Sequence, residues 1–491
     1  MSLSKVIRGS LWLYVSGVAS NLLYYTYWLI ASKFVSSSTI GTAAAALGIA
    51  ILIAGIFNLG LALGATKLFG YVYGHNDQKS LNLYFSSTFA LSLSIYSLVA
   101  ILVLFLPPSI IGLSGNELLF VALLIISGYS SWSHIVVSLF SSTIKTGTIA
   151  LSNILSALLR LVIGTIFLMV GMDLTGVMAA YIVGSVASDL IYFYKLRGVI
   201  KFMKPSLEPI KEVIKAGIPS WIPSLLTTAG TWLGVLGIYG LAGSNQTGNY
   251  YIAFMIASVL YSLPSSFLSL MLFPVLSGMD DGRKRATNKS VRLTCAVIAP
   301  LSVLVIAYPQ IPLSILNASY VASSSILQIL FIGTFIAPIA IGFESLVYAY
   351  SKYQYVAFLG ISANLSRVAL YPVLVTLWGG NGAAISYISG YFLEIMVVAL
   401  LSRRLNYIVG WKPFSMIVGI PSLVGLLFYY INLNWVVSTI LLFTICSVAY
   451  SRLGLITKED LSEISAAFVS RGNIEVMSPY IQFILKILYG E

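Results

Sequence analysis

Long apolar stretches alternate with short polar connections along the whole chain. Each stretch is long enough to cross about 30 Å of hydrocarbon as a helix. The pattern predicts fourteen spans, at residues 9–31, 41–66, 81–106, 118–141, 147–170, 175–194, 216–240, 248–275, 292–308, 326–349, 354–377, 382–402, 413–431 and 434–451. No connection between them is long enough for a soluble domain. We therefore expect an all-α, multi-pass membrane protein.

The basic residues orient these spans. If the N-terminus is cytoplasmic, all but three of the 27 lysines and arginines fall on the inner side, and only Lys33 falls in an outer connection. Segments rich in lysine and arginine stay in the cytoplasm. We expect a plasma-membrane protein with both termini inside. The net charge of +12 follows from this topology and from contact with anionic lipid heads, so it does not require a nucleic-acid partner.

The chain also repeats itself. The segments "TGVMAAYIVG" (175–184) and "NGAAISYISG" (381–390) match at an offset of 206, and Gly41 and Gly248 begin the second and eighth spans at an offset of 207. Six spans repeated once in the same orientation predict a parallel repeat about an axis along the membrane normal. The predicted parts are a six-helix bundle at 1–198, a basic linker at 199–215, a second six-helix bundle at 216–405, two extra helices at 406–452 and an amphipathic cytoplasmic tail at 453–491. This tail includes a capping-box-like pair, Thr457 and Asp460.

Two arginines lie inside predicted spans. Arg160 and Arg367 occupy matching places in the fifth and eleventh spans, where an arginine costs about 2.5–3.5 kcal/mol. Asn153 and Asn364 lie on the same helical faces. One interpretation is a pair of salt-bridged core arginines. The other, which we favour because both arginines have polar neighbours, is a central cationic cavity whose guanidinium forks bind phosphate oxygens.

Polar and aromatic stripes on other spans are typical of a sugar-binding lining. Asn21 and Tyr24 lie on one face of the first span, Lys33 lies at its outer end, and Thr231 lies in the seventh span. We count these four with the arginines and asparagines as candidate substrate-binding residues. Small polar residues also let membrane helices pack closely, so a structural role stays open.

Three acids are candidates for proton or sodium coupling: Asp189, Glu344 and Glu394. Asp189 lies only six residues before Lys195, so its side chain could also simply reach the membrane interface. Catalytic signals are missing from the sequence, which has no nucleotide-binding loop, metal-ligand spacing or Ser/His/Asp set. We expect neither an enzyme nor a bound cofactor or metal.

Three segments resemble a known family. "GLALGATKLFGYVYGHND", "GIPSWIPS" and "LFPVLSGMDDGRKRATNKSVRLT" look like parts of Wzx-type polysaccharide flippases of the multidrug/oligosaccharidyl-lipid/polysaccharide superfamily. The resemblance implies two six-helix bundles and alternating access for a lipid-linked glycan on a polyprenyl or dolichyl phosphate or pyrophosphate. By this likeness Arg160 and Arg367 contact the phosphate or an acidic sugar. The two extra C-terminal helices resemble the lipid II flippase branch.

Two other functions stay open. A cation-coupled multidrug exporter of the same superfamily would have a cavity dominated by acids, whereas the deepest charges here are arginines. A membrane-embedded glycosyltransferase or ligase would have a sizeable outer loop or a catalytic acid near one surface, and neither is evident.

Overall fold

A computed structural model describes residues 3–460, apart from 108–111, 114, 128–131, 266–267, 269–271, 273–275, 277–278 and 280. Every regular element in this part of the chain is a helix, and ten helices are long and apolar enough to cross a membrane. The predicted all-α membrane fold is confirmed. The number of fourteen crossings stays a prediction, and the tail beyond residue 460 lies outside the described residues.

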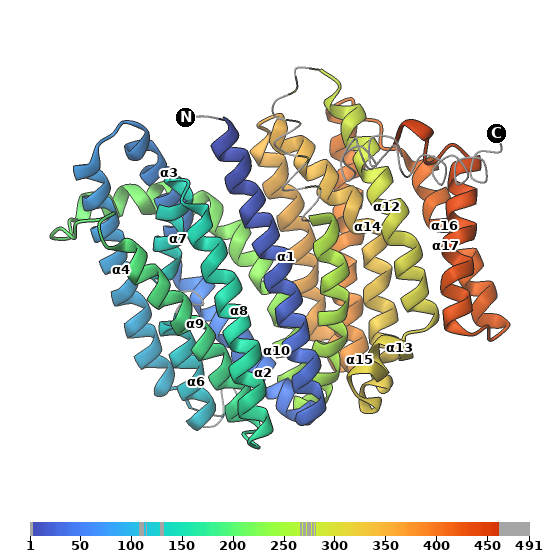
Figure 1. The fold of residues 1–491 in the computed structure, drawn as a ribbon, viewed down its shortest axis with the longest axis horizontal. Coiled ribbons are helices and arrows are strands. Elements are labelled where there is room, and N and C mark those ends of the chain that lie inside the picture. Colours follow the sequence, from blue (N-terminus) through green and yellow to red (C-terminus); the bar gives the residue numbers. More distant parts are fainter. Residues whose placement is uncertain are drawn as a thin grey trace, which may run out of the picture. The chain divides into compact units, whose positions relative to one another are not determined.

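Figure 1 shows the helices in chain order. They are α1 (Leu3–Phe34), α2 (Ser37–Phe57), α3 (Leu61–Gly74), α4 (Gln78–Leu104), α6 (Gly115–Ile126), α7 (Ser133–Ser142), α8 (Thr146–Met169), α9 (Leu174–Leu196), α10 (Leu207–Pro264), α12 (Arg283–Ala307), α13 (Gln310–Leu316), the 3₁₀ helix η2 (Ala318–Ser323), α14 (Ser324–Ala349), α15 (Tyr353–Arg404), α16 (Trp411–Tyr430) and α17 (Trp435–Arg452).

The contacts divide the chain into two compact units. The first comprises Met1–Val259, Leu313–Ile326 and Ala357–Leu393, and the second comprises Leu260–Pro312, Leu327–Val356 and Glu394–Glu491. These boundaries differ from those of the predicted halves, so the division into two six-helix bundles stays a prediction.

Two long helices each cover one predicted span and all or most of the next. In α10 the helical backbone is interrupted at Gly243 (φ 87°), and in α15 it is interrupted at Gly379 (φ 55°). Glycine tolerates a positive φ because it has no Cβ. These two glycines therefore mark the points where one predicted span ends and the next begins.

In the first unit, α8 packs against α1 and α9 (Figure 1). Gly164 allows both helices to come close to α8. A Cβ at this position would lie 2.5 Å from the ring of Tyr27 on α1 and 2.7 Å from the Cβ of Ala180 on α9. The hydroxyl of Tyr27 then donates to the carbonyl of Val177, 3.3 Å away, which ties α1 to α9.

Glycines also bring α2 against α10. A Cβ on Gly41 would lie 1.9 Å from the carbonyl oxygen of Ser244, and a Cβ on Gly248 would lie 1.8 Å from the carbonyl oxygen of Ser37. Only glycine permits backbones to approach this closely. Ser37 and Ser244 are separated by the same 207 positions as the two glycines, so the contact is reciprocal between the repeats.

The predicted span at 41–66 is wrong in one respect, because it consists of two helices. Leu59 (φ 49°) and Gly60 (φ 74°) both adopt left-handed backbone conformations, so α2 ends at Phe57 and α3 begins at Leu61. The turn sits tightly against α10, since a Cβ on Gly60 would lie 2.4 Å from the carbonyl group of Gly217.

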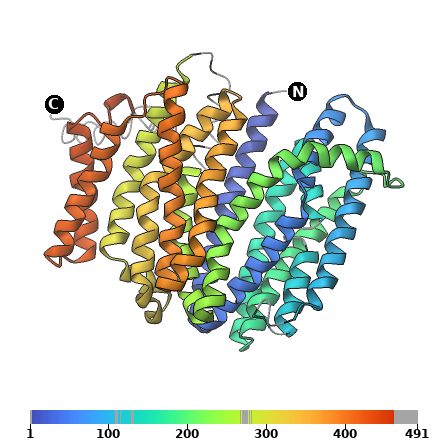
Figure 2. The same ribbon diagram turned by 180° about the vertical axis from the view of Figure 1, so that it is seen from behind.

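In the second unit, α12, α16 and α17 pack together (Figure 2, yellow to red). A Cβ on Gly425 of α16 would lie 2.2 Å from the side chain of Val303 on α12. The hydroxyl of Tyr450 on α17 donates to the carbonyl of Ile417 on α16, 2.6 Å away. The chain then returns through Thr457 and Asp460 to the beginning of α12.

Candidate functional site

Arg160 lies on α8 with its guanidinium against two aromatic rings. Its Cζ is 3.9 Å from the ring centre of Tyr181 on α9 and 4.4 Å from that of Tyr24 on α1. The residue is only 2% exposed. A cation held over a desolvated ring gains about 2 kcal/mol. Helices α1 and α9 thus together offset part of the cost of burying this charge.

Arg367, on the first segment of α15, has a similar environment. Its Cζ is 4.2 Å from the ring of Tyr387 and 4.6 Å from that of Tyr391, both on the second segment of α15. Its Nε donates to the carbonyl of Tyr387 (2.9 Å) and its Nη1 donates to Oδ1 of Asn364 (3.1 Å). The amide of Asn364 donates in turn to Oγ1 of Thr227, 3.3 Å away. Asn364, which the sequence puts on the same helical face as Arg367, thus accepts a hydrogen bond from it.

The sequence repeat accounts for the similar surroundings of Arg160 and Arg367. Tyr181 and Tyr387 are equivalent positions of the repeated segments, and each covers the arginine of its own repeat. Gly184 and Gly390 are equivalent as well, and each faces the arginine-bearing helix. A Cβ would lie 2.9 Å from Ser156 O at Gly184 and 2.3 Å from Arg367 Nε at Gly390.

The tyrosines that cover the arginines were only partly predicted. Tyr24 was a candidate, but Tyr181, Tyr387 and Tyr391 were not, although the repeat already aligned Tyr181 with Tyr387. We call Arg160 with Tyr24 and Tyr181 the first arginine cluster. Arg367 with Tyr387, Tyr391 and Asn364 forms the second arginine cluster.

One turn of α10 supplies rings toward both clusters. The ring centre of Tyr251 lies 5.1 Å from that of Trp28. The Nε1 of Trp28 donates to the hydroxyl of Tyr181, 2.8 Å away. Three residues further along α10, the ring centre of Phe254 lies 5.1 Å from that of Tyr387. Aromatic contacts therefore extend from each arginine to the same short stretch of α10.

The remaining substrate-binding candidates occupy other positions. Asn21 and Lys33 are exposed on α1, and Asn153 is half-buried on α8. Thr231 donates to the carbonyl of Thr227, one turn earlier in α10. Thr227, on the same polar face of α10, is the residue whose hydroxyl contacts the second arginine cluster, through Asn364.

The three candidate acids have different environments. Asp189 on α9 is buried, and its carboxylate accepts a hydrogen bond from Ser133 on α7. Glu344 on α14 and Glu394 on α15 are half-buried. Among the residues that the structure describes, no group of three or more His, Cys, Asp or Glu side chains could hold a metal ion.

Comparison with known proteins assigns the chain to a family. The sequence profile described as "Polysaccharide biosynthesis protein" matches residues 6–280, more than half of the chain. The chain belongs to this polysaccharide biosynthesis protein family. The resemblance to Wzx-type flippases is thereby confirmed at the level of the family.

Individual matches agree with this assignment. A Shigella flexneri protein named "Putative O-antigen transporter" is 23% identical over 267 residues. The match covers 53% of the chain described here and 64% of the Shigella protein. The match thus covers less than two thirds of the relative. A structure of the lipid II flippase MurJ in an inward closed conformation aligns with a TM-score of 0.72 at 15% identity, covering 91% of this chain and all of MurJ. An inward-facing multidrug MATE transporter aligns with a TM-score of 0.66 at 15% identity, covering 79% and 94%. These two structures establish a transporter fold.

Proposed function

We propose that this protein is a flippase that carries a lipid-(pyro)phosphate-linked oligosaccharide from the cytoplasmic to the outer leaflet. The observation that supports it most is the pair of arginine clusters, one in each repeat, on the fold of a transporter. A guanidinium inside the membrane is costly. In a flippase, an arginine at such a position binds the phosphate group of the lipid as it crosses the membrane.

The clusters suit this task because of how they hold the guanidinium. A ring stacked on the face of a guanidinium fixes its plane, and the N–H groups point outward in that plane, where those of Arg367 donate to Tyr387 and Asn364. A phosphate that displaces the present partners can approach in the plane and accept hydrogen bonds from two N–H groups at once. Both arginines are nearly fully buried in this conformation, at 2% and 5% exposure. Binding therefore requires a second conformation in which the clusters open.

The finer points of the proposal follow the sequence. The carrier is a polyprenyl or dolichyl phosphate or pyrophosphate, and the two bundles at 1–198 and 216–405 move about the site. A proton or sodium ion drives them through Glu394, Asp189 or Glu344. Both termini are cytoplasmic in the plasma membrane. A cysteine at the exposed Asn245 should react with an impermeant reagent from outside, and a cysteine at the exposed Lys204 should not.

Transport of an extracted glycolipid in proteoliposomes tests the function. Arg160→Ala and Arg367→Ala should each abolish translocation while the protein still elutes as a folded species. Arg197→Ala removes the same side chain from an exposed position at the end of α9 and should transport normally. Normal transport by both arginine variants would refute the proposal. Mass spectrometry of lipids that copurify with the protein would identify the carrier.

The multidrug exporter remains a second candidate because a MATE structure shares the fold. The same proteoliposomes separate the two functions. An exporter would move a cationic dye against a gradient, and its transport would depend on the acids and not on the arginines. An enzyme is not retained, since the family and the fold are those of transporters.

A further inference from the structure

A cavity of about 450 Å³ in the second unit is formed by residues outside both arginine clusters. Three cationic side chains from successive turns on one face of α12 line it: Arg285, Lys289 and Arg292. Cys295, one turn further along α12, begins an apolar part that includes Ile339 and Ile417. The lining thus joins a cluster of cations to a deeply buried hydrocarbon surface.

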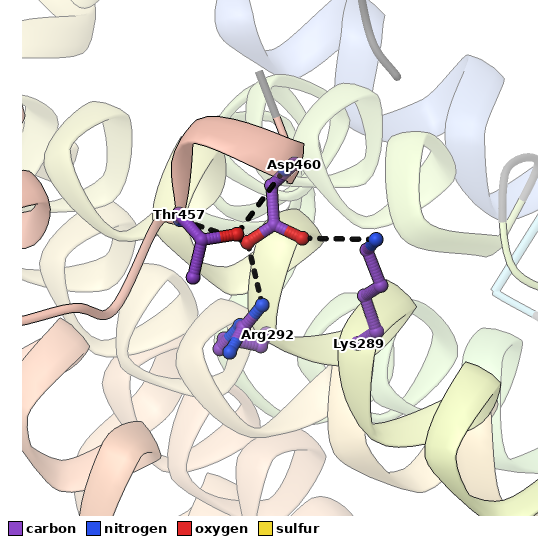
Figure 3. Close-up of polar contacts among 4 residues, drawn as sticks. All are labelled: Lys289, Arg292, Thr457 and Asp460. Carbon is purple, nitrogen blue, oxygen red and sulfur yellow. Dashed lines mark hydrogen bonds and ion pairs between the residues drawn. The ribbon is translucent and has the colours of Figure 1, made fainter. Parts of the chain in front are cut away.

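Asp460 places its carboxylate against two of these cations, Lys289 and Arg292 (Figure 3). Its Oδ1 lies 3.1 Å from Nζ of Lys289, and its Oδ2 accepts from Nη2 of Arg292 at 2.6 Å. The backbone N–H of Thr457 also donates to Oδ2, at 2.9 Å, and Thr457 Oγ1 accepts from the N–H of Asp460. The predicted capping box is confirmed. The carboxylate of Asp460 also forms ion pairs with Lys289 and Arg292.

The charges around Asp460 keep it ionised. Burial alone would raise the pKa of Asp460, but the Thr457 N–H, the Lys289 ammonium and the positive charge of Arg292 together lower it. The side chain is only 2% exposed. A fully ionised anion is therefore held inside the cavity by contacts from α12.

The three cations provide more N–H donors and more positive charge than the single carboxylate of Asp460 uses. Nε of Arg292 is buried and has no hydrogen-bond partner among the described residues. Arg285 is exposed and makes no hydrogen bond or ion pair within the described part of the chain. A carboxylate has two oxygens and one charge. A phosphate monoester has three terminal oxygens and up to two charges, and it matches a guanidinium fork.

We propose that this cavity binds a phosphate-bearing group and that Asp460 fills its anion position when the ligand is absent. A lipid headgroup is one source, since phosphate would meet the cations of α12 while an acyl chain covers Cys295, Ile339 and Ile417. A free phosphate is the other source, since it has the same chemistry. Ligand binding displaces Asp460 and releases the segment that follows α17 from α12.

Native mass spectrometry of the full-length protein in micelles tests this site with three probes. Phosphatidic acid carries phosphate and acyl chains, diacylglycerol carries the chains alone, and inorganic phosphate carries the anion alone. Arg292→Gln should weaken phosphatidic acid binding about tenfold, the effect of losing a hydrogen bond to a charged group. Asp460→Asn removes the internal competitor and should strengthen binding by a similar factor.

Lys284→Gln is the matched control. It removes one cation from the first turn of α12, but Lys284 contacts the carbonyl of Asn406 instead of lining the cavity, so binding should not change. Arg292→Lys keeps the charge, loses the fork and should fall between wild type and Arg292→Gln. It also provides the test if the glutamine variant does not fold.

The outcomes separate the sources. Retention of phosphatidic acid without competition by inorganic phosphate assigns a lipid headgroup, and competition by inorganic phosphate assigns a free phosphate. The proposal is overturned if diacylglycerol binds as well as phosphatidic acid, or if Arg292→Gln and Asp460→Asn both bind like wild type. Each of these results is independent of transport through the arginine clusters.

Discussion

Replacing Gly390 by alanine should disrupt the second arginine cluster with a single added carbon. The new Cβ would lie 2.3 Å from Nε of Arg367 and 2.6 Å from the carbonyl oxygen of Ala363. The backbone carbonyl cannot move away cheaply, so the two segments of α15 must separate or Arg367 must leave its place. In either case the bond from Arg367 Nε to Tyr387 O is weakened.

The magnitude follows from three contributions. Overpacking costs about 1–3 kcal/mol, and a weakened hydrogen bond from a charged group costs about 1.5–3 kcal/mol. Alanine returns about 1 kcal/mol relative to glycine in a helix. The net loss of folding free energy is therefore about 1.5–5 kcal/mol. Thermal and denaturant unfolding of the purified protein measure it.

Two other glycines make this a graded test. At Gly184, the equivalent position of the first repeat, the nearest atom would be Ser156 O at 2.9 Å, so alanine should cost less. At Gly360, on the same helix as Arg367, a Cβ meets nothing within 4 Å, so alanine should be neutral or stabilising. If Gly390→Ala melts at the same temperature as Gly360→Ala, the glycine does not position Arg367 and the reasoning fails.

Three further predictions concern other parts of the molecule. Gly41→Ala should lower the melting temperature and impair transport, because its Cβ collides with the backbone of Ser244, whereas the Cβ of Gly17→Ala meets nothing within 4 Å and this variant should do neither. Because the pKa of Asp460 is lowered from 3.8, the stabilisation that its ion pairs provide should persist from neutral pH down to that value. It should be lost only as the pH falls further, so the difference in melting temperature between wild type and Asp460→Asn should be constant above pH 3.8 and shrink below it. If Glu394 carries the coupling ion, Glu394→Gln should abolish gradient-driven transport with binding of the glycolipid retained, and unchanged transport would assign it a structural role.

The sequence predicted the parts of the fold that depend on hydropathy and repetition. Apolar length located the helices, and the matching segments around Tyr181 and Tyr387 already contained both the ring and the glycine that each arginine needs. The break between α2 and α3 was missed because Leu59 is not a residue type that favours a positive φ. The turn also lies against Gly217, more than 150 residues away, and no local pattern indicates that contact.

Contacts between distant residues account for what the sequence could not show. The carboxylate of Asp189 accepts a hydrogen bond from Ser133, 56 positions earlier, and no local pattern links the two residues. The capping box at Thr457 and Asp460 was visible from spacing alone. That its carboxylate meets Arg292, 168 positions earlier, depends on how the second unit folds.

The reciprocal contact of α2 with α10 has a geometric consequence. Gly41 and Gly248 are copies of one repeat position, and each would strike the backbone near the other if it carried a side chain. A position that touches its own copy lies beside the two-fold axis that relates the copies. If the two predicted repeats are related by a two-fold axis, that axis passes between these two glycines. In an ancestor made of two identical single-repeat chains, one codon would have specified both sides of this contact, so a single mutation would have introduced the clash twice. In a single chain that carries both repeats the two codons can diverge independently, and here both encode glycine.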